Sequence, residues 1–115
     1  MISANKNISI NVALDEKNIP EKISMLADDS GTDKPINCRA MILAMWDNDN
    51  KETLRLDLWT KDMTIDEMKI FFHETLVTMA DTLQKSTADD RISGDMQDFC
   101  DHFAEKMEIR TKDGG

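Results

Sequence analysis

Short runs of alternating hydrophobic and polar residues fill the first half of the chain, and this period of two predicts β-strands. The first run covers residues 8–14, and a shorter one covers residues 22–27. A polar turn that ends at Pro20 separates the two runs. The segment 28–37, which contains a glycine and a proline, predicts a surface loop.

The next run, residues 38–46, is apolar on both of its faces. A strand of this kind needs cover on both sides. Helices of the same chain can supply one cover, and the other must come from a curled sheet, a second subunit or a bound client. The residues of the first face are Cys38, Ala40, Ile42, Ala44 and Trp46, and those of the second face are Met41, Leu43 and Met45.

A polar turn at residues 47–51 leads into a fourth strand, residues 54–59, whose leucines point inward. Tryptophan is enriched at protein interfaces as well as in cores. We expect Trp46 to pack inside, and Trp59 to lie either in the core or on a contact surface. The candidate partner-binding residues are Arg55, Asp57 and Trp59 on the outer face of the fourth strand, with Met41, Leu43 and Met45 on the third.

The hydrophobic period changes to a helical one beyond Trp59. Thr64 is expected to begin the first helix, because its hydroxyl and the Glu67 carboxylate can form a capping box. A polar break at residues 85–87 then separates this helix from a second one. The first helix has its apolar stripe at Ile65, Met68, Phe72, Leu76, Met79 and Leu83, and the second at Ile92, Met96, Phe99, Phe103 and Met107.

These elements predict a single α+β domain over residues 8–109. The fold class is an antiparallel sheet of about four strands followed by two C-terminal helices packed on one face, in the order ββββαα. A chain of 115 residues has room for one domain, which buries roughly two thirds of the surface of its unfolded form. Residues 1–7 and 110–115 are expected to be flexible termini.

Charge excludes several classes of partner. The formal net charge of −9 repels phosphate backbones and anionic lipids, so we expect no nucleic acid partner. No apolar run of 18 residues or more is present, which argues against a membrane span. Residues 1–7 show neither a signal peptide nor a lipobox cysteine, so a full-length chain is expected to be cytoplasmic. Nine methionines suit either a core or an adaptable contact face.

Candidate chemistry is sparse, and we expect no enzyme, cofactor or metal site. The segment from Asp47 to Asn50 resembles the start of a calcium loop, but an EF-hand needs Gly and Glu where this chain has Glu52 and Leu58. His73 and His102 lie on helices beside carboxylates, with no nucleophile at local spacing. Cys38 and Cys100 are expected to be buried free thiols rather than a disulfide.

Four segments resemble the gliding motility-associated protein GldC family. They are Leu54 to Met68, Phe71-Phe72-His73, Met79-Ala80-Asp81-Thr82 and Asp98 to Lys106, and the resemblance runs from about Ile8 to Ile109. The most specific part is the Asp-Leu-Trp-Thr-Lys-Asp-Met pattern at Asp57 to Met63. The resemblance implies an association with gliding motility, a process tied to a cell-envelope motor and to the secretion apparatus for surface adhesins. It carries no catalytic residue across.

Two functions follow as expectations. The first is a non-enzymatic accessory protein of the bacterial gliding machinery that binds a protein of the gliding or secretion apparatus, in the form of a homodimer. The alternative is a SecB-like chaperone that holds unfolded export clients, an analogy at the level of the fold alone. A weaker possibility is a small-molecule pocket between the sheet and the helices.

Overall fold

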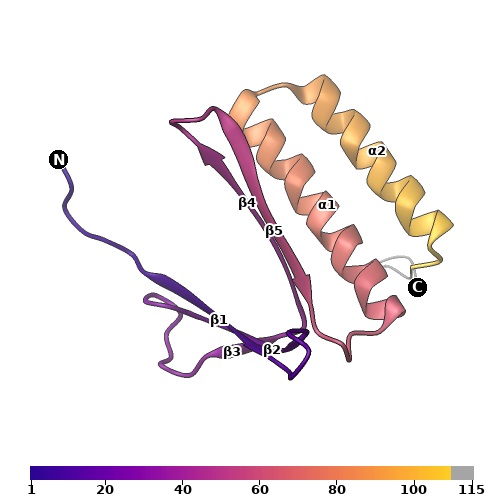
Figure 1. The fold of residues 1–115 in the computed structure, drawn as a ribbon. Helices are drawn as coiled ribbons and strands as arrows, with labels where there is room; N and C mark the ends of the chain where they lie inside the picture. Colours follow the sequence, from indigo (N-terminus) through magenta and orange to yellow (C-terminus); the bar gives the residue numbers. More distant parts are fainter. Residues whose placement is uncertain (110–115) are drawn as a thin grey trace. The chain divides into compact units, whose positions relative to one another are not determined.

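The computed structural model describes residues 1–109 and contains five strands followed by two helices (Figure 1). The predicted α+β class and the order of strands before helices are confirmed. The strands are β1 (Ile8–Leu14), β2 (Pro20–Ala27), β3 (Ile36–Cys38), β4 (Ala40–Asp47) and β5 (Glu52–Trp59), and the helices are α1 (Ile65–Thr87) and α2 (Asp90–Lys106). Residues 110–115, predicted to be a flexible terminus, lie outside the described residues.

The chain divides after Met63 into two compact units. We call the part up to Met63 the strand unit and the part from Thr64 onward the helix unit. The extent of a single domain over residues 8–109 therefore stays a prediction. Residues 1–7 precede the first strand and are all exposed.

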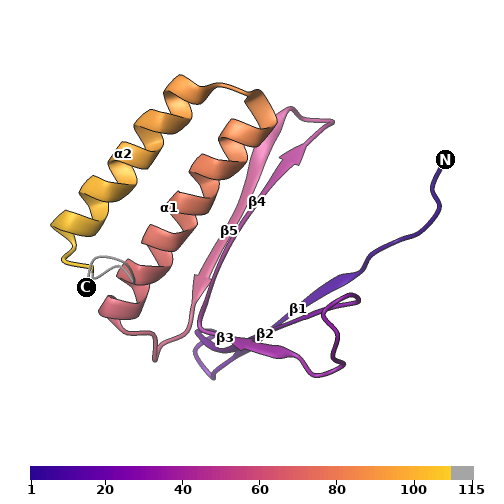
Figure 2. The ribbon, with the colours of Figure 1, turned by 180° about the vertical axis from the view of Figure 1, so that it is seen from behind.

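The first sheet joins β1, β2 and β3 in antiparallel order (Figure 2). Its best-packed row crosses all three strands, because Ile23 pairs with Val12 on one side and with Cys38 on the other. Ile23 is 1% exposed and is the one buried apolar residue of the strand unit. An irregularity in register lies between Ala13 and Leu14, at the end of β1.

The second sheet is the β4–β5 hairpin, and it corrects the predicted strand count. The single third strand expected at residues 38–46 is divided at Arg39, so the strands are five in two sheets instead of about four in one. Cys38 pairs with β2, whereas Ala40 pairs with Trp59 of β5. At the start of β2, the Pro20 carbonyl accepts from the Lys61 N–H at 3.2 Å, beyond the end of β5.

The helix unit begins where its capping chemistry predicts. The Thr64 hydroxyl accepts from the Glu67 N–H, and the Glu67 carboxylate accepts from the Thr64 N–H, both at 3.1 Å. The break between the helices lies at residues 88–89 rather than at 85–87. Ala88 has a left-handed φ of 58° and closes α1, and the Asp89 side chain then caps α2. Side-chain polarity at residues 85–87 did not end the helix because that end is set by backbone geometry.

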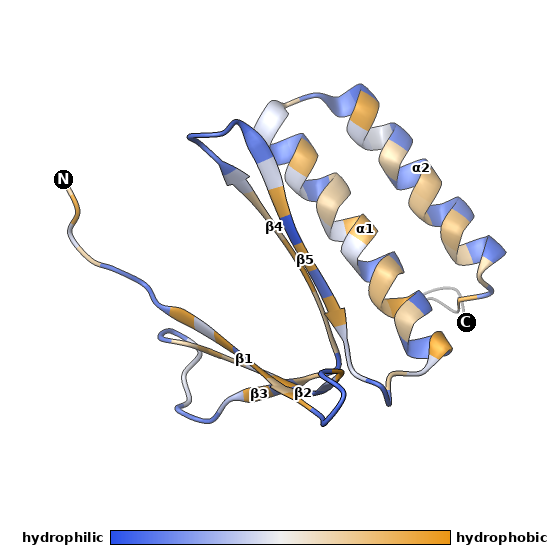
Figure 3. Cartoon of the chain, in the orientation of Figure 1, coloured by the Kyte–Doolittle hydropathy of each residue, from blue (hydrophilic) through white to orange (hydrophobic). Residues whose placement is uncertain are grey.

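Small residues form the best-buried stripe of α2, at Ser93, Cys100 and Ala104. Their spacing of seven and four residues places them on one side of the helix. The predicted stripe is therefore rotated, since Ile92 and Phe99 are 47% and 53% exposed. Figure 3 shows apolar and polar residues interspersed along both helices. Ala80 is the buried residue of α1, and His73 of α1 stacks on Phe103 of α2 with ring centroids 6.3 Å apart.

Candidate functional site

The β4–β5 hairpin has two faces of different chemistry. Its register is regular over eight residue pairs, and residues that pair directly lie on the same face. The aliphatic face consists of three apolar pairs, namely Met41 with Leu58, Leu43 with Leu56 and Met45 with Leu54, and ends at the turn with the charged pair Asp47 with Glu52. The tryptophan face consists of the pairs Ala40 with Trp59, Ile42 with Asp57, Ala44 with Arg55 and Trp46 with Thr53.

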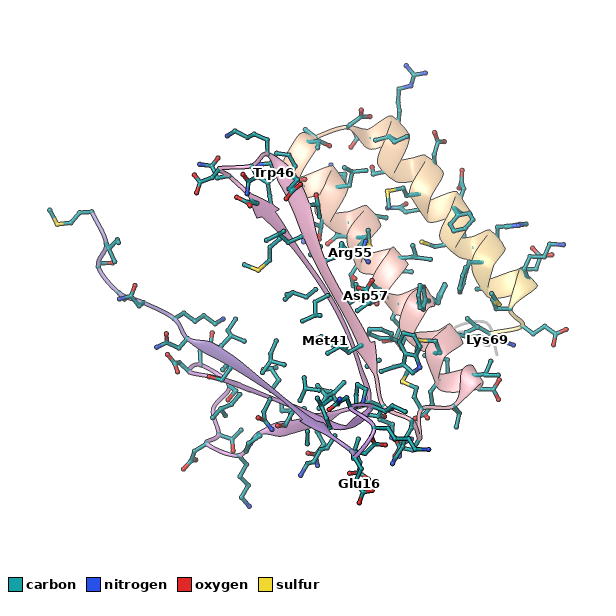
Figure 4. The ribbon with its side chains drawn as sticks, viewed as in Figure 1. Glu16, Met41, Trp46, Arg55, Asp57 and Lys69 are labelled. Atoms are coloured by element: carbon teal, nitrogen blue, oxygen red, sulfur yellow. The ribbon has the colours of Figure 1, made fainter. Side chains whose placement is uncertain are left out.

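The six candidate residues do not form one surface. Met41, Leu43 and Met45 belong to the aliphatic face, whereas Arg55, Asp57 and Trp59 belong to the tryptophan face. Figure 4 shows Met41 on the other side of the hairpin from Arg55 and Asp57. The candidate contact surface thus separates into two faces, each of which needs its own test.

The aliphatic face is continuous and largely open. Met45 is 59% exposed, and Leu54 and Leu56 are 52% and 47% exposed. The other three residues of this face, Met41, Leu43 and Leu58, are half-buried. The charged Asp47–Glu52 pair lies only at the turn end of this face, beyond the three apolar pairs. Figure 3 shows β5 alternating between orange and blue, as expected for leucines at every second position. Such a surface is a candidate for contact with another apolar surface.

The tryptophan face carries both indoles at opposite ends of the hairpin. Trp46 is 63% exposed and Trp59 is 58% exposed. The expectation that Trp46 packs inside is wrong, because its cross-strand neighbour is the short Thr53 at the exposed turn. Between the indoles, Arg55 Nη2 donates to both Asp57 carboxylate oxygens at 3.2 Å. This ion pair is solvent-exposed, so it orients the two side chains more than it stabilises the fold.

The turn between β4 and β5 uses its own acidic group. Asp47 Oδ1 accepts from the N–H groups of Asp49 and Asn50, and Oδ2 accepts from the Asn50 side chain at 2.9 Å. The hydrogen bond from the Asn50 backbone is the largest cause that lowers the pKa of Asp47 below its ordinary value. Lys51 has a left-handed φ of 56°. The segment is the predicted hairpin turn.

A network that the sequence did not predict surrounds Thr60 and Lys61, and we call it the Thr60–Lys61 corner. Thr60 is 2% exposed, and its N–H donates to the Arg39 carbonyl at 2.7 Å. Lys61 donates its backbone N–H to Pro20 and places its ammonium 3.1 Å from Asp15 and 3.4 Å from Glu21. These bonds join the end of the hairpin to the first sheet. The most family-specific stretch of the chain therefore has a structural role here.

The described part of the helix unit contains grooves with apolar lining residues, of which we consider two. The first, of about 390 Å³, is bounded by both helices. The second, of about 380 Å³, lies toward the other end of the same helices. Methionines contribute to each groove, as is typical of adaptable apolar surfaces. The first is lined by Ile65, Met68, Lys69, Phe72, Phe103 and Met107, and the second by Thr78, Met79, Thr82, Leu83, Ser86 and Met96.

The remaining candidate residues are the two histidines and the two cysteines. His73 stacks on Phe103, and His102 lies 6.2 Å from the Phe99 ring. Both thiols are free, but only Cys100 is buried, and Cys38 is half-buried. Burial raises the pKa of the Cys100 thiol. Within residues 1–109 no three His, Cys, Asp or Glu side chains gather as metal ligands, and no helix there has the length and apolarity to cross a membrane.

Comparison with known families gives a match over most of the chain. The model of the family described as "Gliding motility-associated protein GldC-like" matches residues 20–109. This range runs from the start of β2 to just beyond α2 and includes the hairpin, the Thr60–Lys61 corner and both helices. No curated protein and no solved structure matches the chain. The chain belongs to the GldC-like family of gliding motility-associated proteins.

Proposed function

We propose that this protein is a non-enzymatic accessory protein of the gliding machinery that binds another protein through the β4–β5 hairpin. Family membership supports the process. One observation supports the mode of action: both faces of the hairpin present large apolar side chains to solvent. The partner belongs to the gliding or secretion apparatus. Two free thiols suit a reducing compartment, so the proposal includes action in the cytoplasm.

The tryptophan face is the better candidate for the contact with this partner. Trp and Arg are the residue types that most often dominate binding energy, because each combines a large contact area with a polar group. Trp46, Arg55 and Trp59 lie on this one face, and the hydrogen bonds that Arg55 donates to the Asp57 carboxylate hold the guanidinium in place. Binding would remove much of the apolar surface of the two exposed indoles from contact with water, which favours association.

The central test is complementation of a gliding bacterium that lacks the gene. The double variant Trp46→Ala and Trp59→Ala should abolish gliding and the crosslinked capture of the partner from native cells. The matched control is Ile36→Ala on β3, which removes a 47% exposed side chain outside the hairpin and should restore both. Full gliding by the double variant, at wild-type protein level, would overturn the assignment of this face.

The SecB-like alternative makes a different prediction. A holder of export clients would suppress the aggregation of unrelated unfolded proteins, whereas a dedicated adaptor would not. The assay needs only the purified chain and two unrelated aggregating proteins. Suppression of both at equimolar chain, lost in the tryptophan double variant, would replace the adaptor proposal with the chaperone one.

A further inference from the structure

Strand β4 has an open edge. It pairs only with β5 among residues 1–109, so the hydrogen-bonding groups on its other side have no strand neighbour there. A two-stranded hairpin by itself is marginally stable in water, and a third strand or a packed layer is normally required. The edge of β4 is therefore the place where the second sheet can grow.

Open edges usually carry devices that prevent pairing with another chain, such as charges, prolines or bulges. Residues 40–46 contain no charge and no proline, in a chain that is 32% charged. The β4–β5 register shows no bulge. By contrast, β5 carries the Arg55–Asp57 ion pair. Because residues 40–46 of β4 have no charge, proline or bulge, the edge of β4 is suited to pairing with another strand.

Strand β1 is the competing edge, because residues 8–14 are also uncharged. It differs in two respects. The register of β1 shifts at Ala13/Leu14, and one face of β1 carries the polar Ser9 and Asn11. β4 is regular along its whole length, and its residues 40–46 are apolar on both faces. β4 is thus the better protein-binding edge.

We propose that β4 pairs antiparallel with β4 of a second copy of this chain, which makes a four-stranded sheet with the order β5–β4–β4–β5. The inference rests on the proposed protein-binding function, because it identifies a second copy of this chain as one of the proteins that the hairpin binds. The two copies are related by a two-fold axis perpendicular to the sheet. Each face of the sheet then stays continuous only if odd-numbered residues pair with odd-numbered ones and even-numbered residues with even-numbered ones. Leu43 then lies opposite Leu43 of the second copy, and Met41 lies opposite Met45.

This register is complementary in both size and charge. On the tryptophan face, Ala40 lies between Trp59 of its own chain and Trp46 of the second copy, so a small residue is flanked by two large ones. At each end Arg39 lies opposite Asp47, which brings opposite charges together. Between these ends the paired strands carry no charge, so two chains of net charge −9 can meet there without facing carboxylates.

A crosslinking experiment on the purified full chain tests the edge and the register together. In a Cys38→Ser background, Leu43→Cys should form a covalent dimer on mild oxidation, because directly opposed residues across antiparallel strands approach disulfide distance. The controls are Leu56→Cys, on the same face of β5, and Asn11→Cys, at the middle of β1. Each control should give at most about a tenth of the Leu43→Cys yield under conditions where proximity decides the reaction.

Light scattering supplies a second measurement that needs no new cysteine. The wild-type chain should show twice its 13.1 kDa mass, and Ala44→Lys should show the single mass, because a charge on the edge blocks pairing. Thr53→Lys, on the same face of β5, should leave the dimer intact. Circular dichroism checks that Ala44→Lys is folded.

The inference is overturned by a single-chain mass of the wild type at micromolar concentration, or by equal or greater crosslinking at Leu56→Cys or Asn11→Cys. None of these measurements depends on motility or on the gliding partner. A failure of the proposed gliding contact therefore remains distinguishable from a failure of the dimer.

Discussion

The helix unit and the strand unit satisfy their side chains in different ways. The helix unit caps both of its helices with its own side chains, Thr64 and Asp89, and buries a stripe of small residues. The strand unit buries one apolar side chain, Ile23, and leaves the leucines and tryptophans of the hairpin largely exposed. Burial of apolar surface is the main source of stability. The hairpin thus gains little of this stability within the strand unit, which agrees with the proposal that another protein covers it.

The Thr60–Lys61 corner explains how the strand unit keeps its shape with so little buried apolar surface. Polar groups there are paired rather than packed, through Thr60, Lys61 and Asp15. A buried backbone group that is left without a partner costs more free energy than its bond contributes when made. The corner thus fixes the direction of the hairpin while leaving its faces free for contact.

The largest expected effect comes from Ile23→Ala. Removal of a fully buried isoleucine side chain lowers the free energy of unfolding by about 2–5 kcal/mol. The matched control is Ile8→Ala, which removes the same atoms from a 59% exposed position and should cost about 0.5 kcal/mol. Urea denaturation of the dimer-blocked Ala44→Lys background measures both. Equal effects of the two variants would mean that the strand unit has no distinct core.

The capping box gives the next largest effect. Thr64→Ala removes the acceptor for the Glu67 N–H and should lower the free energy of unfolding by about 1 kcal/mol. Thr78→Ala serves as the control, because its hydroxyl bonds only to carbonyls of the preceding turn of α1 and is exposed. Thermal and urea denaturation followed by far-UV circular dichroism compare the two. If Thr78→Ala costs as much as Thr64→Ala, the cap is not what defines the start of α1.

A smaller, pH-dependent effect belongs to the Thr60–Lys61 corner. The N–H groups of Ile19 and Lys17, in that order, lower the pKa of Asp15 below its ordinary value of 3.8, and Lys61 adds to them. A lowered pKa means that the carboxylate stabilises the fold above about pH 4, and that this contribution is lost as the pH falls through the folded-state pKa. Asp15→Asn should therefore be less stable than wild type at pH 7, and the difference should close on acidification below about pH 4.

The Thr60–Lys61 corner raises the pKa of Lys61, whereas it lowers the pKa of Asp15. Its hydrogen bond to Asp15 and the nearby Glu21 raise the pKa of the ammonium above 10.5. This contribution is present below the unfolded-state pKa and is lost only as the pH rises through the higher folded-state value.

The control for the Asp15→Asn prediction is Asp33→Asn, in the loop between β2 and β3, which tests for a general charge effect. A stability difference for Asp15→Asn that persists unchanged at pH 2 would contradict the proposed role of the carboxylate.

The local features were the most predictable from the sequence. The capping box at Thr64 and the turn at Asp47 each depend on side chains within a few residues, so spacing alone identifies them. The division of the third strand at Arg39 was not predictable in this way. It depends on which strand lies alongside, and the Lys61 N–H to Pro20 carbonyl bond spans a separation of about 40 residues.

The candidate site shows the same limit. Alternation identified which residues share a face of one strand, but the register between β4 and β5 decides which faces coincide. That register separates Met41, Leu43 and Met45 from Arg55, Asp57 and Trp59. The buried stripe of α2 was misplaced for a related reason. Hydrophobicity alone favours Phe99 over Ser93, whereas close approach of two helices selects small side chains.

The two thiols allow a direct comparison of the units, with the smallest expected effect on the fold. Cys100 of the helix unit is buried. Burial is the largest cause that raises the pKa of its thiol, and the adjacent Asp101 carboxylate raises it further. Cys38 of the strand unit is half-buried, with Sγ 3.7 Å from the Ile36 carbonyl. Because the thiolate is the reactive form, a thiol reagent at pH 7 should label Cys38 first and Cys100 several-fold more slowly. Cys38→Ser should remove the fast phase and Cys100→Ser the slow one. A fast phase that survives in Cys38→Ser would show that the helix unit opens as readily as the strand unit, and the contrast between them would fail.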